Sequence, residues 1–226
     1  MFKDKRVIIV GPSSYLENMK SGEFIDSFDL VVRINNVHDV NDKKLVEDLG
    51  KKVDVIYFDG SMDTDRFNAY SILSPELIKC TYPKTEWFYE DRCNTNIEIL
   101  KKHFKTQVID SEKYNNLKYA LDNNLKVRPN SGLISIIDLL SLPIKELYIT
   151  GIDFYRNAYS SYHPDYGLSN LNDIKEIFKK GDNGDVHDIN KQFKYFKTYV
   201  CVDKRINMDD TLKNYLQDPK LENVLF

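Results

Sequence analysis

Residues 127–157, VRPNSGLISIIDLLSLPIKELYITGIDFYRN, decide the fold. The stretch opens on a polar turn, continues with apolar residues at helical spacing and breaks at Pro143. Residues 146–150 then predict a short buried strand, and Gly151-Ile152-Asp153-Phe154-Tyr155 leaves its carboxyl end. A polar turn at a helix N-terminus suits a phosphate or carboxylate, and the carboxyl ends of parallel strands face the ligand crevice of an α/β sheet. The stretch therefore predicts a shared anion site, with a capped helix beside an ordinary strand exit as the alternative.

The rest of the chain alternates short apolar runs with helical patterns. Further strands are predicted at 6–10, 30–34, 53–58, 86–89, 107–109 and 199–202. Helices are predicted at 43–49, 74–79, 95–104, 111–121, 172–180, 188–196 and 209–216. This alternation is typical of an α/β fold with a single Rossmann-like, mostly parallel sheet flanked by helices. Residues 1–226 are expected to form one domain, with the polar, turn-rich residues 153–187 as a lid subdomain.

Composition narrows the class of protein. The chain has 226 residues, and its 32 Lys and Arg against 35 Asp and Glu give a net charge of −3, so nothing indicates a nucleic-acid partner. No apolar run approaches the roughly 20 residues that span a bilayer. Three widely spaced cysteines argue against a disulfide framework and do not have metal-ligand spacing. A cytoplasmic location is expected, with the inner face of the membrane as a further option.

Several familiar catalytic motifs are absent from the sequence. It contains no G-x-G-x-x-G after the first strand, no G-x-x-x-x-G-K-[ST], no H-E-x-x-H and no G-x-S-x-G. This disfavours dinucleotide oxidoreductases, P-loop NTPases, zincins and α/β-hydrolases. Asp63-Thr64-Asp65 matches the D-x-D pattern with which many nucleotide-sugar transferases hold a divalent metal. Such a short acidic pattern also arises by chance in a chain this acidic.

Polar residues follow the first three predicted strands. Gly11-Pro12-Ser13-Ser14 could offer N–H and hydroxyl groups to a phosphate. Arg33 and Asn35 at the second exit and Asp59 at the third lie where a nucleoside would bind in an open α/β sheet. As surface turn residues they would be unremarkable.

Among the four histidines, His187 is the best candidate for a general base. A histidine can take up a proton near neutral pH. His187 flanks the candidate lid, whereas an arbitrary histidine is more often structural.

Together these residues resemble the sialyltransferase family, most closely the bacterial lipooligosaccharide type that uses CMP-N-acetylneuraminic acid. The resemblance spans roughly residues 5–200, and its most specific part is the Gly-Ile-Asp-Phe-Tyr segment with the Ser-Ser-Tyr that follows it. The animal enzymes share this arrangement of sequence blocks in their L and S sialylmotifs. The matching blocks are the first strand with Gly11, Arg33-Ile34-Asn35, Gly50-Lys51-Lys52 with Tyr57-Phe58-Asp59, Arg128-x-x-Ser131-Gly132, and residues 147–155 with Ser160-Ser161-Tyr162.

The resemblance implies a role for each matching residue and a GT-A-like variant of the fold. His187 would deprotonate the acceptor hydroxyl, while Tyr155 and Tyr162 would donate hydrogen bonds to the leaving phosphate. Asn35 and Asp59 would lie near the cytidine and ribose, although the bacterial relatives carry an amide at the second position. The remaining substrate-binding residues would be Gly11, Ser13, Ser14, Arg33, Arg128, Asn130, Ser131, Gly132, Asp153 and Ser161.

The implied activity is metal-independent, inverting transfer of sialic acid from CMP-sialic acid to a galactoside or sialoside, with no cofactor. The partners would be the CMP-sugar, an oligosaccharide acceptor and, as in bacterial relatives, further copies of the chain. One alternative is a CMP-Kdo-type transferase, and another is a metal-dependent UDP- or GDP-sugar transferase using Asp63 and Asp65. A non-catalytic nucleotide-binding domain is the third, because Pro12 and Gly184 depart from the family pattern.

Overall fold

A parallel β-sheet forms the centre of the protein, seen here in a computed structural model that describes residues 1–61, 64–82, 90–123, 127–162 and 187–218. Within these residues the sheet has seven strands in the order β5-β4-β3-β2-β1-β6-β7, and every neighbouring pair is parallel. The predicted fold class is confirmed. The strands are β1 (Arg6–Val10), β2 (Leu30–Ile34), β3 (Val55–Phe58), β4 (Leu77–Cys80), β5 (Thr106–Val108), β6 (Glu146–Thr150) and β7 (Ile206–Met208).

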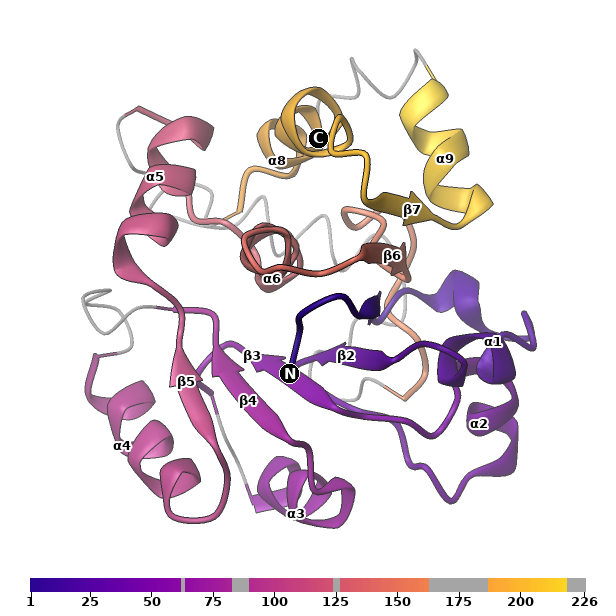
Figure 1. Cartoon of the computed structure of the whole chain (residues 1–226), viewed down its shortest axis with the longest axis vertical. Helices are drawn as coiled ribbons and strands as arrows, with labels where there is room; N and C mark the ends of the chain where they lie inside the picture. Colours follow the sequence, from indigo (N-terminus) through magenta and orange to yellow (C-terminus); the bar gives the residue numbers. More distant parts are fainter. Residues whose placement is uncertain (62–63, 83–89, 124–126, 163–186, 219–226) are drawn as a thin grey trace.

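Helices cover both faces of the sheet (Figure 1). The apolar run of β1 is buried on both sides, as its sequence predicts. Val7 and Ile9 belong to one core with residues of α5 (Ser111–Leu121), α6 (Ser131–Leu140) and α8 (Ile189–Tyr195). Ile8 and Val10 belong to a second core with residues of α1 (Gly22–Asp26) and α2 (Lys43–Leu49). The helices are η1 (Ser14–Leu16), α1 (Gly22–Asp26), α2 (Lys43–Leu49), α3 (Thr64–Leu73), α4 (Glu90–Lys101), α5 (Ser111–Leu121), α6 (Ser131–Leu140), α8 (Ile189–Tyr195), η4 (Phe196–Val200) and α9 (Asp210–Gln217).

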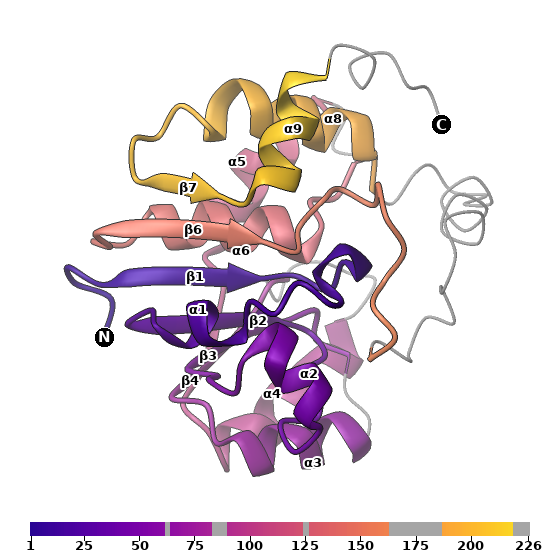
Figure 2. The ribbon, with the colours of Figure 1, turned by 90° about the vertical axis from the view of Figure 1, so that its right-hand side faces the viewer.

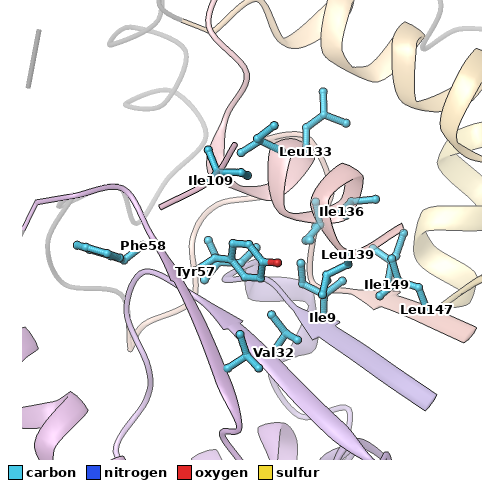
Figure 3. Packing of buried hydrophobic residues seen from close by; sticks show 14 of the residues in the cluster. Ile9, Val32, Tyr57, Phe58, Ile109, Leu133, Ile136, Leu139, Leu147 and Ile149 are labelled. Atoms are coloured by element: carbon cyan, nitrogen blue, oxygen red, sulfur yellow. The ribbon is translucent and has the colours of Figure 1, made fainter. Parts of the chain in front are cut away.

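The apolar face of α6 packs directly on the sheet (Figure 3). Leu133, Ile136 and Leu139 are fully buried and meet side chains of β1, β2, β3 and β6. Burying three such side chains contributes several kcal/mol, at about 1.5–3 kcal/mol each. This packing holds the N-terminus of α6 near the carboxyl edge of the sheet.

The exits of β1 and β6 contact each other through two glycines. A Cβ atom on Gly11 would lie 2.2 Å from the carbonyl oxygen of Gly151, and a Cβ on Gly151 would lie 2.5 Å from the carbonyl oxygen of Gly11. Gly151 also has a φ of 70°, in the left-handed region that glycine adopts without strain. The segment 151–162 leaves β6 here and crosses the carboxyl edge of the sheet, where the strand arrowheads of Figure 2 lie.

Two predicted elements are wrong. Residues 74–79 are not a helix, because the chain forms α3 earlier and then enters the fully buried strand β4. Residues 199–202 are not a strand, because α8 continues into the π-helical turn η4 and the last strand is β7. A short apolar run does not distinguish a strand from a buried helical turn. The predicted strand at 86–89, the helix at 172–180 and most of the lid lie outside the described residues.

None of the helices in the described part of the chain combines the length and the apolar composition that crossing a membrane requires. The cytoplasmic location, the single-domain boundary, the lid and the homo-oligomer stay predictions.

The glycine contact makes a testable prediction about stability. We expect Gly11→Ala to lower the free energy of unfolding by about 1–3 kcal/mol, because the new methyl group would meet rigid backbone rather than a flexible side chain. Urea unfolding measures this change. Gly132→Ala is the matched control: its nearest neighbours would lie at 3.4 Å, an ordinary contact. We expect it to stabilise helix α6 by up to about 1 kcal/mol. Equal midpoints for Gly11→Ala and the wild type would contradict this account of the strand exits.

Candidate active site

The N-terminus of α6 forms one wall of the candidate site. Asn130 is the N-cap of this helix, and its side-chain oxygen accepts a hydrogen bond from the N–H of Leu133 at 2.8 Å. The N–H of Asn130 donates to the side-chain oxygen of Gln192 at 2.8 Å, which joins α6 to α8. The hydroxyls of Ser131 and Thr81 lie 3.1 Å apart, which joins α6 to the exit of β4. The first turn of α6 is therefore held in place while its N–H groups and partial positive charge face the carboxyl edge.

The segment that follows β6 forms the opposite wall. Phe154 and Tyr155 both have left-handed backbones, with φ of 54° and 60°, a conformation that is unusual for aromatic residues. The buried ring of Phe154 packs against Phe193 and Phe196, with ring centroids 5.4 and 5.0 Å away. This anchor keeps Phe154 in the core while the chain turns Tyr155 toward α6.

Asp153 holds the same segment against the exit of β1. Its buried carboxylate accepts hydrogen bonds from the hydroxyl of Ser13 at 2.7 Å and from the N–H and side-chain amide of Asn157 at 2.9 and 2.8 Å. Burial raises the pKa of Asp153, although these hydrogen bonds oppose that rise. The hydroxyl group of Ser13 therefore donates its hydrogen bond to Asp153. The N–H of Ser14 likewise donates to the carbonyl oxygen of Ala158, at 2.9 Å.

Tyr155 is partly buried and meets α6. The side chains of Asn130 and Tyr159 hydrogen-bond to its phenol oxygen, and the ring of Tyr159 lies edge-on to it at 5.9 Å. Burial raises the pKa of Tyr155, and the charges of Asp153 and Asp59 raise it further. The phenol therefore stays protonated at neutral pH and can act as a hydrogen-bond donor.

His187 reaches the same helix N-terminus from the residues that precede α8. Its Nδ1 lies 2.9 Å from the carbonyl oxygen of Arg128, two residues before the N-cap. A carbonyl oxygen only accepts, so Nδ1 carries the proton and Nε2 carries the lone pair. Burial lowers the pKa of His187 to about 4, and the charge of Arg128 adds a smaller lowering, while the hydrogen bond to the Arg128 backbone and the charge of Asp59 oppose this change. The imidazole is therefore neutral at pH 7, with Nε2 able to take up a proton.

Asn35 and Asp59 lie together at the exits of β2 and β3. Asn35 has a φ of 55°, and its side-chain oxygen accepts from the N–H of Asp59 at 2.9 Å. One carboxylate oxygen of Asp59 accepts from Ser61 and is paired with Arg66 at 3.3 Å. The charge of Asp59 raises the pKa values of both Tyr155 and His187, so its carboxylate lies within electrostatic range of both side chains.

Three predicted residues make contacts outside this group. The buried guanidinium of Arg33 donates to the carbonyl oxygens of Leu49 and Lys52, at the C-terminal end of α2. Burial lowers its pKa to about 10. Tyr162 packs with the second core, and its hydroxyl lies 3.4 Å from the carbonyl oxygen of Gly11. The N–H of Ser161 donates to Glu17, at 2.8 Å, on the same side.

The structure also contains a residue that supports the site and that the sequence analysis missed. Arg66 of α3 is buried and binds Asn36, Asp59 and Ser61 through its guanidinium. No motif marks it, and its helix was predicted in the wrong place.

A charged network lies beneath α6. Asp138 is buried and accepts hydrogen bonds from Lys79 of β4, Lys113 of α5 and the phenol of Tyr57. Burial alone would raise the pKa of Asp138, but Lys79 and Lys113 hold it below its usual range. In Figure 3 the phenol oxygen of Tyr57 is directed toward α6. The network fixes the middle of α6 to the sheet, as Ser131 fixes its beginning.

Among the described residues, no group of three or more His, Cys, Asp or Glu side chains is arranged to hold a metal ion. Of the D-x-D pattern, Asp65 is exposed in the first turn of α3, and Asp63 lies outside the described residues.

A parallel sheet with a helix N-terminus and polar strand exits at its carboxyl edge is typical of α/β proteins that bind nucleotides. The model of glycosyltransferase family 29 (sialyltransferase) matches residues 3–140, which is more than half of the chain. The chain therefore belongs to this family and is a glycosyltransferase. The predicted resemblance is confirmed. No curated protein matches the chain.

Solved sialyltransferase structures share the fold. The sialyltransferase CstII from Campylobacter jejuni, in complex with cytidine-5'-monophosphate, is 20% identical over 80% of this chain and 78% of its own, with a TM-score of 0.52. A variant of the sialyltransferase CST-II in complex with CMP is 22% identical over 98% of this chain and 89% of its own, with a TM-score of 0.59. A mammalian sialyltransferase in complex with Gal-beta-1-3GalNAc-ortho-nitrophenol is 13% identical over 91% of this chain and 69% of its own, with a TM-score of 0.54.

The environment of His187 makes a direct prediction. We expect its imidazole to titrate near pH 4 and to carry its proton on Nδ1 above that pH, because burial opposes the charged form and Arg128 accepts from Nδ1. Nitrogen-15 NMR of the histidine rings measures both properties. His187→Gln assigns the signal, since burial also lowers the pKa of His38 to about 4. Titration between pH 6 and 7, or a proton on Nε2, would contradict this geometry.

Proposed function

We propose that this chain transfers sialic acid from CMP-sialic acid to a hydroxyl group of a galactoside or sialoside, with inversion and without a metal. Membership of the sialyltransferase family supports the reaction class, and similar folds that bind CMP support the donor. The observation that carries the proposal is the meeting of Asn130, Tyr155 and His187 around the N-terminus of α6.

The helix N-terminus and the phenol suit the phosphate of CMP. N–H groups of Ser131 and Gly132 would bind its oxygens, aided by the positive end of the α6 dipole. Gly132 leaves space for a Cβ atom, because that atom would meet its nearest neighbours only at 3.4 Å. Packing inside the protein therefore does not require this glycine, whereas a phosphate lying close to the backbone would. Tyr155 would donate to the phosphate as negative charge develops on the departing CMP.

Asn35 and Asp59 would bind the cytidine side of the donor. Their shared hydrogen bond joins the exits of β2 and β3 next to the site. A carboxylate accepts but does not donate, so Asp59 would select hydroxyl groups such as those of ribose. Arg66 pairs with Asp59 at 3.3 Å and would hold its carboxylate in position.

His187 would act as the general base. Its Nε2 lone pair would remove the proton of the acceptor hydroxyl, which then attacks the anomeric carbon on the face opposite the departing CMP. The charge of Asp59 favours the imidazolium that this step forms. An attack opposite the leaving group inverts the configuration of that carbon.

The role of His187 is tested by substitution. We expect His187→Gln to lower kcat for sialyl transfer by roughly 10²- to 10⁴-fold while the Kd for CMP stays unchanged, because the base acts on the acceptor and not on the nucleotide. Product formation and calorimetric titration with CMP measure the two effects. His103→Gln is the control, since His103 is exposed and precedes β5 at the opposite edge of the sheet. Full activity of His187→Gln across the pH range would remove the proposed base.

The CMP-Kdo and metal-dependent alternatives differ from this proposal in donor and metal requirement. A screen of CMP-, UDP- and GDP-sugars with and without EDTA separates them by nucleotide release. Release from a UDP- or GDP-sugar that stops in EDTA and returns with Mn²⁺ would favour the metal-dependent transferase. Tight CMP binding without turnover of any donor would favour a binding domain.

A further inference from the structure

Gln192 of α8 is a fully buried polar side chain, and the proposed mechanism gives it no direct role. Both ends of its amide contact the turn that precedes α6. The side-chain oxygen accepts from the N–H of Asn130 at 2.8 Å, and the side-chain nitrogen lies 3.5 Å from the carbonyl oxygen of Arg128. Buried polar side chains are nearly always hydrogen-bonded, and here both ends of one amide meet the same turn.

The chemistry of this turn calls for an amide. A backbone N–H can only donate and a carbonyl oxygen can only accept, so their partner needs one acceptor and one donor side by side. Glutamine supplies both. An ionised glutamate would bring an oxygen against the carbonyl oxygen of Arg128, and a methionine of similar length would take the acceptor away from the N–H of Asn130. A buried backbone group that loses its partner is costly, so the turn would shift.

The carbonyl oxygen of Arg128 is also the partner of the proposed general base. Nδ1 of His187 lies 2.9 Å from it. His187 directly precedes Asp188, the N-cap of α8, and the N–H of Gln192 donates to the carbonyl oxygen of Asp188 at 3.0 Å. The two side chains therefore extend from the same end of α8 to one backbone oxygen.

The same turn also begins α6. Asn130 is the N-cap of that helix, and its side-chain oxygen accepts from the N–H of Leu133 at 2.8 Å. Residues 128–130 thus fix the position of the proton on His187 and also hold the helix N-terminus that suits a phosphate. A displacement of this turn would disturb the base and the anion site together.

We propose that Gln192 is a positioning residue: it holds residues 128–130 so that α6 presents its N–H groups to the donor while His187 keeps its proton on Nδ1. Gln192 itself touches neither substrate. The kinetic part of this inference rests on the proposed sialyl transfer, whereas the effect on His187 is measured without turnover.

Gln192→Met tests the kinetic part, because it keeps the length of the side chain and removes both polar groups. We expect kcat for sialyl transfer to fall by about 10- to 100-fold with KM for the acceptor within about twofold, because a small displacement of the base affects the chemical step and not acceptor binding. Leu212→Ala is the control for lost stability, since it removes a buried apolar side chain of α9. Its kcat should stay within about twofold of the wild type, and urea unfolding compares the two variants.

Nitrogen-15 NMR of His187 supplies the readout that a general loss of stability would not move. In the wild type we expect one neutral tautomer, with the proton on Nδ1. In Gln192→Met we expect a mixture of the two neutral tautomers, because the carbonyl oxygen of Arg128 is no longer held in place. Gln192→Glu is the second variant, with nearly the shape of the native side chain, and we expect the same mixture from it.

Two results would overturn the assignment while leaving sialyl transfer intact. The first is a single Nδ1–H tautomer in Gln192→Met and in Gln192→Glu, with kcat unchanged. The second is an equal loss of kcat in Leu212→Ala, which would make the effect one of stability alone. A wild-type chain that does not release CMP from CMP-sialic acid would overturn the proposed transfer instead, and the tautomer of His187 in the two Gln192 variants would still decide whether Gln192 positions it.

Discussion

The contact between the backbones of Gly11 and Gly151 is the constraint on which the site depends. Because neither residue carries a Cβ atom, the exits of the two adjacent strands β1 and β6 can touch, and the N–H of Ser13 reaches the carbonyl oxygen of Gly151 at 3.1 Å. The N–H of Gly151 donates to Tyr15 on the other side. This contact turns the 151–162 segment back over the end of β1, so that Asp153 can hold Ser13 and Tyr155 can face α6.

The opposite wall owes its position to buried polar groups rather than to close backbone packing. Asp138 joins α6 to β3, β4 and α5, and the hydroxyl pair of Ser131 and Thr81 joins its first turn to the exit of β4. A buried charge is tolerated only when it is paired and hydrogen-bonded, as Asp138 is. The site thus combines a rigid helix N-terminus with a strained loop, and the strain at Phe154 and Tyr155 falls where a side chain must be aimed.

The sequence predicts most of the sheet because the central strands are continuous apolar runs with clear breaks. It fails at β4, where Lys79 looks like a surface residue and is instead buried against Asp138, a contact that no local pattern reveals. Asn130, Tyr155 and His187 all lie at the N-terminus of α6, and their roles in binding and catalysis stay predictions. Arg33 instead donates to the backbone at the C-terminal end of α2. The contact between Tyr159 and Tyr155 depends on the bridge from Tyr159 to the distant Ser13, which no local pattern reveals.

A crystal structure of the protein with CMP tests the central claim most directly. We expect the phosphate to lie within hydrogen-bond distance of the Tyr155 hydroxyl and of an N–H group of Ser131 or Gly132, with the cytidine next to Asn35 and Asp59. His187 should face the open side of the phosphate with Nε2. A phosphate bound away from the α6 N-terminus, with Tyr155 and His187 in no contact with the ligand cavity, would contradict the account.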